Sequence, residues 1–330
     1  MAPVLSHPWG PLPLPADLVW VIASSLPRQD QYAILLTSWS LHDIVAPILY
    51  RSVEIWIQPV MMDAVIERDP RPFNILSNLA HSARYANSPQ PSRCYAAHIL
   101  TLSYVGLDLS ANFRALPLLA EVCRVAERLH HLRLDVDSNS ISLFMDTFIR
   151  KQVVITLTNP ANRWRDREAS ASILPRLVSI RSSKPAIVES LMRFRNVEIA
   201  VVDSSGSTEV FSGFFVFPSA LRCDQLTHFS YCIHPDDCIL HLHAVSKTFP
   251  QLHHLSLRCT PGLTEEVFGL ALAILQAEPF KLPHLRSFCV NHGRISITYQ
   301  DLLETSAAEV RIVGSDRSSL DTVIVGAVAQ

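Results

Sequence analysis

Apolar residues between 14 and 50 recur at the three- and four-residue spacing of helices. Leu18, Val21, Ile22 and Leu26 fall on one face of a first helix, which has a proline near each end. Two further faces follow, made of Tyr32, Leu35, Leu36 and Trp39, and then, interrupted by Pro47, of Leu41, Ile44, Val45, Ile48 and Leu49. Three short helices cannot bury all of this apolar surface among themselves. The pattern therefore predicts a helical unit that a partner, the following domain, or both must cover.

From residue 97 onward the pattern changes to strands alternating with helices. The motif Leu-x-x-Leu-x-Leu begins at Leu129 and again at Leu252, and related apolar versions follow Pro175, Pro250 and Pro283. Proline lacks an N–H and ends a helix, so each motif is expected to lead into a strand. The relaxed matches have a mean spacing of about 26 residues, within the period of leucine-rich repeats. They begin at residues 97, 129, 152, 177, 194, 226, 252, 285 and 307.

Helical stripes stand between these motifs. Their members are Leu116, Leu119, Ala120, Cys123 and Ala126, then Ile187, Val188, Leu191 and Met192, and then Val267, Leu270, Ala271, Ile274 and Leu275. A strand followed by an amphipathic helix, when repeated, stacks into a parallel sheet, because one unit cannot cover its own apolar face. The predicted fold is α/β: three short helices, then an irregular leucine-rich-repeat-like solenoid with a curved parallel sheet. The run Val323–Val325 is expected to be its last repeat strand.

Charge and glycine content remove several classes of function. The formal net charge is −2, whereas nucleic-acid binding needs a clustered basic surplus. The nine glycines are widely spaced, so the chain has no dinucleotide fingerprint, no P-loop and no glycine-flanked nucleophile elbow. No catalytic motif emerges, and neither a cofactor nor a nucleic-acid partner is expected.

The N-terminal residues and the cysteines bear on location. Residues 1–13 are rich in proline and lack periodicity, so they are expected to be a disordered tail. They have neither the basic start nor the apolar core of a secretory signal, and no stretch fits a membrane helix. Seven cysteines are expected to be reduced thiols. These features predict an intracellular protein, cytoplasmic or nuclear, without a membrane partner.

The segment 14–53 resembles an F-box. It opens with Leu14-Pro15-Ala16-Asp17-Leu18-Val19, continues through Ile22, Leu26-Pro27 and Asp30, and closes with Leu49-Tyr50-Arg51-Ser52-Val53, an ending common in fungal members. It departs from the family pattern at Gln31, Tyr32, Thr37, Ser38, Trp39 and Leu41. With this resemblance the chain divides into a tail (1–13), an F-box-like helical domain (14–53), a connecting segment (54–96) and a leucine-rich-repeat-like domain (97–330).

The resemblance implies a function. F-boxes bind a Skp-type adaptor, which links them to a cullin and a RING subunit of a ubiquitin ligase, while the repeats hold a protein substrate. The chain would then be a non-catalytic substrate receptor. Carried onto this sequence, the adaptor-facing set is Leu14, Pro15, Leu18, Ile22, Leu26, Leu36 and Leu49. Three alternatives stay open: these residues form only an internal core, the chain is a leucine-rich scaffold with no ubiquitin role, or it is an α/β enzyme without a recognisable motif.

Two clusters contain residue types that can bind metal ions, but we expect no metal site at either cluster. The first cluster is a stretch rich in cysteine and histidine: Cys223, His228, Cys232, His234, Cys238, His241, His243, His253, His254 and Cys259. It lacks the Cys-x-x-Cys pair that zinc sites usually contain. Asp135, Asp137, Asn139 and Asp146 resemble part of a calcium loop, but Ser140 stands where the loop needs glycine. Residues 135–140 are instead expected to be a polar loop capping a helix around 143–149. The basic-aromatic run 163–167 is expected to be a solvated loop.

Overall fold

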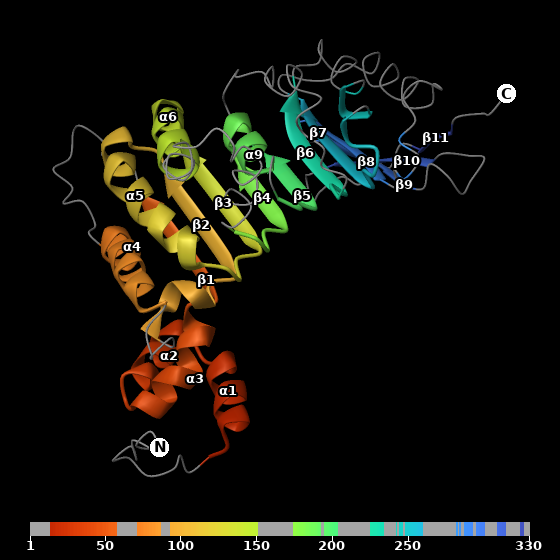
Figure 1. The fold of residues 1–330 in the computed structure, drawn as a ribbon. Helices are drawn as coiled ribbons and strands as arrows, with labels where there is room; N and C mark the ends of the chain where they lie inside the picture. Colours follow the sequence, from red (N-terminus) through yellow and green to blue (C-terminus); the bar gives the residue numbers. More distant parts are fainter. Residues whose placement is uncertain are drawn as a thin grey trace, which may run out of the picture.

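The chain folds into a small helical unit followed by one long sheet (Figure 1). The computed structural model describes residues 14–57, 71–86, 93–150, 174–192, 195–203, 225–233, 242, 244–246, 248–259, 282, 284, 287–292, 295–300, 309–314 and 324–326. The expected tail, the stripe at 267–275 and the run 163–167 lie outside these residues.

The helical unit consists of α1 (Ala16–Ser25), α2 (Arg28–Leu35) and α3 (Trp39–Leu49). Pro15 and Pro27 precede the first two helices, where a fixed φ and a missing N–H are tolerated. The Ser38 side chain caps α3 by accepting a 3.2 Å hydrogen bond from the backbone N–H of Leu41. The expected interruption at Pro47 is wrong: α3 continues through it, because a single bond lost in the last turn is affordable.

Within the described residues the sheet has eleven strands, and their spatial order is their order in the sequence. Every pairing from β1 to β8 is parallel, which confirms the α/β class. These strands are β1 (Ser52–Ile57), β2 (Thr101–Gly106), β3 (His131–Val136), β4 (Ser179–Ser182), β5 (Ile199–Val202), β6 (His228–Ile233), β7 (His254–Cys259) and β8 (Ser287–His292).

The last three strands turn back on the sheet. β9 (Ile295–Gln300), β10 (Glu309–Gly314) and β11 (Ile324–Gly326) pair antiparallel. The run 323–325, expected to be the last repeat strand, overlaps the last strand β11, but β11 pairs antiparallel and so does not continue the parallel repeats. Only two residues separate β8 from β9, whereas a parallel crossover needs about a dozen or more.

Helices cover one face of the sheet (Figure 1). They are α4 (Arg71–Ser82), α5 (Leu109–Val125), α6 (Ile141–Phe144) and α9 (Pro185–Met192), with short turns η1 (Ala83–Tyr85), η3 (Tyr95–His98) and η4 (Ser138–Ser140) and the π-helical turn η5 (Met145–Arg150). The stripes expected in α5 and α9 are largely confirmed, because Leu116, Leu119, Ile187 and Leu191 are buried in one core shared with the strands. β1 and α4 lie in the segment expected to be only a connection, and β1 crosses the expected boundary at 53.

Candidate functional site

Helix α1 turns most of its apolar side chains away from the protein. Val19 and Ala23 point inward and are buried. Leu18, Val21 and Ile22 remain 52 %, 60 % and 47 % exposed. The stripe seen in the sequence is therefore the outer face of α1 and not its packing face.

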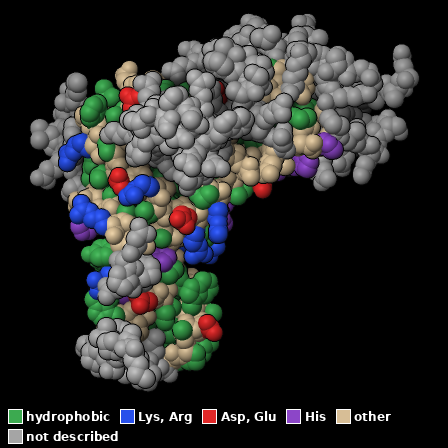
Figure 2. All heavy atoms as spheres, viewed as in Figure 1, with side chains coloured by type: hydrophobic (Ala, Val, Ile, Leu, Met, Phe, Trp, Pro, Cys, Tyr) green, Lys and Arg blue, Asp and Glu red, His purple; other side chains and the backbone are tan. Residues whose placement is uncertain are grey.

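The same exposure extends over the whole helical unit. We call the following residues the N-terminal apolar surface: Leu14, Leu18, Trp20, Val21, Ile22, Tyr32, Leu36 and Trp39, all exposed. Figure 2 shows hydrophobic side chains gathered over this end of the molecule. The unit's own core cluster, by contrast, contains only Ala23, Leu35, Val45 and Ala46 among the described residues. Exposed large apolar side chains gathered on one small unit are typical of interaction surfaces.

The seven residues implied to face an adaptor separate into two groups. Leu14, Pro15, Leu18, Ile22 and Leu36 are exposed. Leu26 and Leu49 are half-buried, and Leu49 packs against the core of the helical unit. The set omitted four members of the N-terminal apolar surface: Trp20, Val21, Tyr32 and Trp39. Three of them lay on the apolar faces read from the sequence, but spacing alone could not tell which face would point outward.

Gln31, one of the departures from the family pattern, has a structural role. It is buried, and its Nε2 donates hydrogen bonds of 3.0 Å to the carbonyl oxygens of Ala23 and Leu26. These carbonyls lie at the C-terminal end of α1, where the last carbonyls have no i+4 helical partner, although that of Ala23 also accepts a 3.2 Å bond from the Leu26 N–H. Gln31 therefore fixes α2 against the end of α1 and holds the outer face of α1 in place.

A pocket of about 410 Å³ lies where the helical unit meets the sheet domain. It is lined by Leu35, Leu36, Thr37, Ser38, Trp39, His42 and Tyr95. The buried His42 shares a 3.0 Å hydrogen bond between its Nε2 and the Tyr95 hydroxyl. The guanidinium of Arg93 lies 4.5 Å from the centre of the Trp39 ring. The pocket therefore has a polar floor beside two exposed apolar side chains.

Stacked tyrosines join the same two parts of the chain. The rings of Tyr50 and Tyr95 are 4.5 Å apart and inclined by only 15°. Burial raises the pKa of Tyr50 to about 12, and the nearby Tyr95 and Tyr32 add to that shift. The junction between α3 and η3 is therefore built from aromatic contacts in addition to the His42–Tyr95 hydrogen bond.

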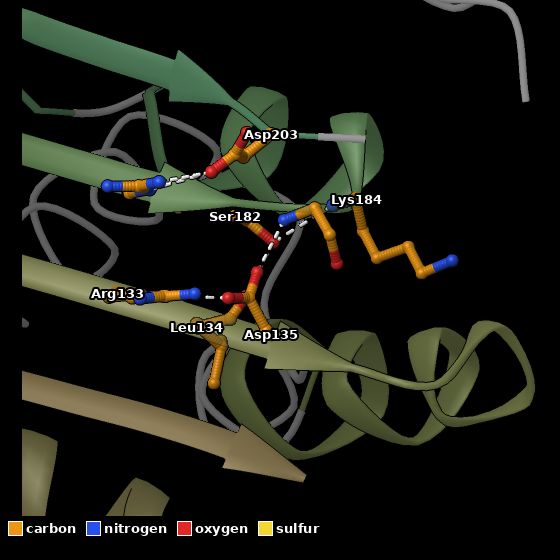
Figure 3. Close-up of polar contacts among 8 residues, drawn as sticks. Arg133, Leu134, Asp135, Ser182, Lys184 and Asp203 are labelled. Atoms are coloured by element: carbon orange, nitrogen blue, oxygen red, sulfur yellow. Dashed lines mark hydrogen bonds and ion pairs between the residues drawn. The ribbon is translucent and has the colours of Figure 1, made fainter. Parts of the chain in front are cut away.

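A second surface lies at the carboxyl ends of β3 to β5 (Figure 3). Arg133 donates from Nε to Asp135 at 2.8 Å, and Asp135 also accepts a 2.6 Å bond from the backbone N–H of Ser183. Arg181 forms an ion pair with Asp203. Carboxylates thus hold two arginine side chains of neighbouring strands in fixed positions.

The residues resembling a calcium loop serve other purposes. Asp135 belongs to β3 and is engaged as above, whereas Asp137 accepts from the backbone N–H groups of Asn139 and Ser140 at 2.9 and 3.2 Å. Asp137 therefore caps η4, which leads into α6, so the expected capping is confirmed here. The expectation of a loop from residue 135 is wrong, because β3 continues to Val136.

The residues considered for zinc are only partly described. His228 and His254 stack across β6 and β7 with ring centres 4.1 Å apart. Cys223, His234, Cys238, His241 and His243 lie outside the described residues. Within the described part, no group of three or more His, Cys, Asp or Glu could hold a metal ion.

Comparison with known proteins adds no relative. No family model matches the chain, and no curated protein matches it. Among the helices described, none combines the length and the apolar character needed to cross a bilayer. A function must therefore be inferred from the two surfaces described above.

Proposed function

We propose that this protein is a non-catalytic substrate receptor of a Skp–cullin–F-box ubiquitin ligase. In this proposal α1–α3 dock a Skp-type adaptor, and the strand-and-helix domain holds a protein substrate. The observation that carries the proposal is the N-terminal apolar surface: eight large apolar side chains are exposed on a unit with a very small core. Such a surface gains most from being covered by a second chain.

The composition of the surface supports protein docking. Stable interfaces have an apolar centre in which a few large side chains carry most of the binding energy, and tryptophan and tyrosine are favoured there. Trp20, Tyr32 and Trp39 supply such side chains on the same helical unit as Leu18 and Ile22. The residues that resemble an F-box occupy these same helices.

The rest of the chain supports the second half of the proposal. A leucine-rich-repeat-like arrangement requires strands that add side by side in chain order, with helices on one face. β1 to β8 follow that order and direction. The face opposite the helices is then available to a substrate.

The decisive experiment replaces Ile22 by aspartate and measures co-purification of a Skp-type adaptor. Ile22 is 47 % exposed, so Ile22→Asp should leave the fold intact, as circular dichroism would verify. An adaptor that covers this position would bury an unpaired carboxylate, at a cost of about 3–5 kcal/mol. Adaptor recovery should therefore fall by more than about 100-fold.

Gln29→Asp is the matched control. Gln29 is exposed near the start of α2, where a negative charge suits the helix dipole. It adds the same charge to the same unit and should keep adaptor recovery near that of the parent. Equal recovery by Ile22→Asp and the parent would refute the docking proposal. Adaptor capture that never brings a cullin would favour the alternative, a leucine-rich scaffold with no ubiquitin role.

A further inference from the structure

The sheet face opposite the helices carries a row of polar and charged side chains. Glu54, Ser103, Arg133 and Arg181 are aligned across β1 to β4 by the strand register. Their neighbours along each strand point to the other face and are buried. No described helix covers this row, which we call the open-face row.

Arg133 and Arg181 stand directly opposite each other on adjacent strands. Like charges in this position destabilise a sheet. The structure moderates the repulsion by giving each arginine its own carboxylate: Asp135 accepts from Arg133 Nε at 2.8 Å, and Asp203 accepts from Arg181 Nε at 3.1 Å. An arrangement that is costly for folding and then locally compensated is characteristic of a functional site.

The two members of each ion pair differ in their access to solvent. The side chains of Asp135 and Asp203 are only 9 % and 14 % exposed, whereas those of Arg133 and Arg181 are 36 % and 46 % exposed. A guanidinium has five N–H donors, and Arg133 uses only Nε on its carboxylate. What an approaching molecule meets is therefore a pair of pre-oriented guanidinium groups with further donors to offer.

An aromatic anchor lies beside them. Trp56 on β1 is 53 % exposed although it belongs to a strand, and the Arg133 guanidinium lies 5.9 Å from the centre of its ring. Tryptophan and arginine are the side chains most enriched at the energetic centres of interfaces. The open-face row thus combines positive donors with an apolar platform.

We propose that this face binds an acidic peptide segment of a protein partner. The guanidinium groups of Arg133 and Arg181 donate hydrogen bonds to a glutamate or aspartate carboxylate of the segment, and Trp56 packs against an apolar side chain near it. Charge complementarity selects this partner, because the exposed atoms of both ion pairs are the positive ones. Glu54, exposed at the β1 end of the row, keeps a second carboxylate away and so sets the orientation of the segment. The inference rests on the proposed function only in taking the sheet domain as the part that holds substrate.

Fluorescence anisotropy with the full-length chain tests the proposal. The probe is a fluorescein-labelled 12-residue peptide with four glutamates and two leucines in a glycine–serine background. We expect Arg133→Gln, Arg181→Gln and Trp56→Ala each to weaken binding by about tenfold, because each removes a charge-assisted bond or the aromatic anchor. Raising the salt concentration from 0.05 to 0.3 M should weaken binding to the parent chain as well.

Two controls make the outcome decisive. Arg124→Gln removes an arginine of the same chain that is exposed on α5 and paired with Glu121, and it should bind the probe as the parent does. A second probe with glutamine in place of glutamate should bind at least tenfold more weakly. Equal binding of the two probes would overturn the proposal, as would parent-like binding by Arg181→Gln and Trp56→Ala. Neither of these two variants leaves a fully buried group unpaired, so both should fold.

The test also separates this inference from the proposed function. Ile22→Asp should bind the acidic probe as well as the parent does, while Arg181→Gln should capture adaptor normally. If only the adaptor experiment failed, the proposed peptide site would still be supported. If only the peptide experiment failed, the proposed adaptor docking would still be supported.

Discussion

Asn112 connects β2, α5 and the turn that follows β3. It is fully buried in α5, and its Oδ1 accepts a 2.6 Å bond from the Tyr104 hydroxyl of β2. Its Nδ2 donates to the Gly106 carbonyl at 2.9 Å and to Asp137 at 2.7 Å. A Cβ at position 106 would overlap Asn112 and Tyr104, which explains why glycine ends β2. One amide thus fixes the carboxyl ends of β2 and β3 against α5.

We expect Asn112→Ala to lower the free energy of unfolding by about 3 kcal/mol, because it leaves the buried hydroxyl and carbonyl without their partner. Urea unfolding of both chains measures the difference. Asn139→Ala is the matched control: Asn139 is exposed in η4, and its side chain makes none of the contacts of this network. An equal effect of the two substitutions would show that the network does not stabilise the fold.

The residues of this network show where sequence reasoning stops. Asp137 could be assigned a capping role because its partners, Asn139 and Ser140, are local. Asn112 could not be singled out, because its partners are brought together only by the stacking of two strands and a helix. Arg133 and Arg181 were hidden for the same reason: their opposition depends on strand register, which a single sequence does not determine.

At the scale of the elements, leucine spacing predicted strands where the motif is strict. Leu129 and Leu252 each precede a strand by two residues, as expected, and the following motif leucines are buried. Where other apolar residues replace leucine, the predicted start of the motif is displaced from the start that the structure shows. The match at residue 97 should begin at Ile99, which is the buried residue that precedes β2. Apolar residues are too common for a relaxed motif to fix its own frame.

The junction between α3 and η3 should respond to alkaline pH. The folded chain holds the Tyr50 proton up to a pKa of about 12, whereas an unfolded tyrosine titrates near about 10. Between these values the unfolded state loses its proton first, so the free energy of unfolding falls as pH rises from about 10 to about 12. Below about pH 10 the stabilisation is fully present.

Tyr50→Phe should remove part of that fall, since phenylalanine keeps the stack on Tyr95 but cannot ionise. We expect the decrease in unfolding free energy between pH 9 and pH 12 to be smaller by about 1 kcal/mol, because solvent screens this partly buried group. Denaturant titrations of both chains at several pH values provide the measurement. Parallel pH curves for the parent and Tyr50→Phe would contradict the assignment.

Across the whole molecule, the two surfaces lie on different parts of one continuous framework. The N-terminal apolar surface belongs to the helices beside β1, and the open-face row begins on β1 itself (Figure 1). Tyr95 ties these parts together through His42 and Tyr50. A partner bound to the helices would therefore be held at a fixed orientation relative to anything bound on the sheet.

The order of the strands also determines which strands a destabilising core substitution should affect. Because each strand of the parallel part contacts only its sequence neighbours, a cavity should loosen nearby strands and leave distant ones protected. Leu255 of β7 is buried, and β7 pairs with β6 and β8. Leu102 of β2 is buried, and β2 pairs with β1 and β3. Each leucine is therefore a probe of one end of the sheet.

Hydrogen exchange followed by mass spectrometry should distinguish the two ends. Leu255→Ala, which costs about 2–5 kcal/mol locally, should speed amide exchange in β6 and β7 and leave β1 and β2 unchanged. Leu102→Ala should give the reverse pattern, and each variant serves as the control for the other. If both variants accelerated exchange evenly along all the parallel strands, the sheet would be a single cooperative unit. Confinement of each effect to its own end would mean that the strands next to the helical unit open independently of β6 and β7.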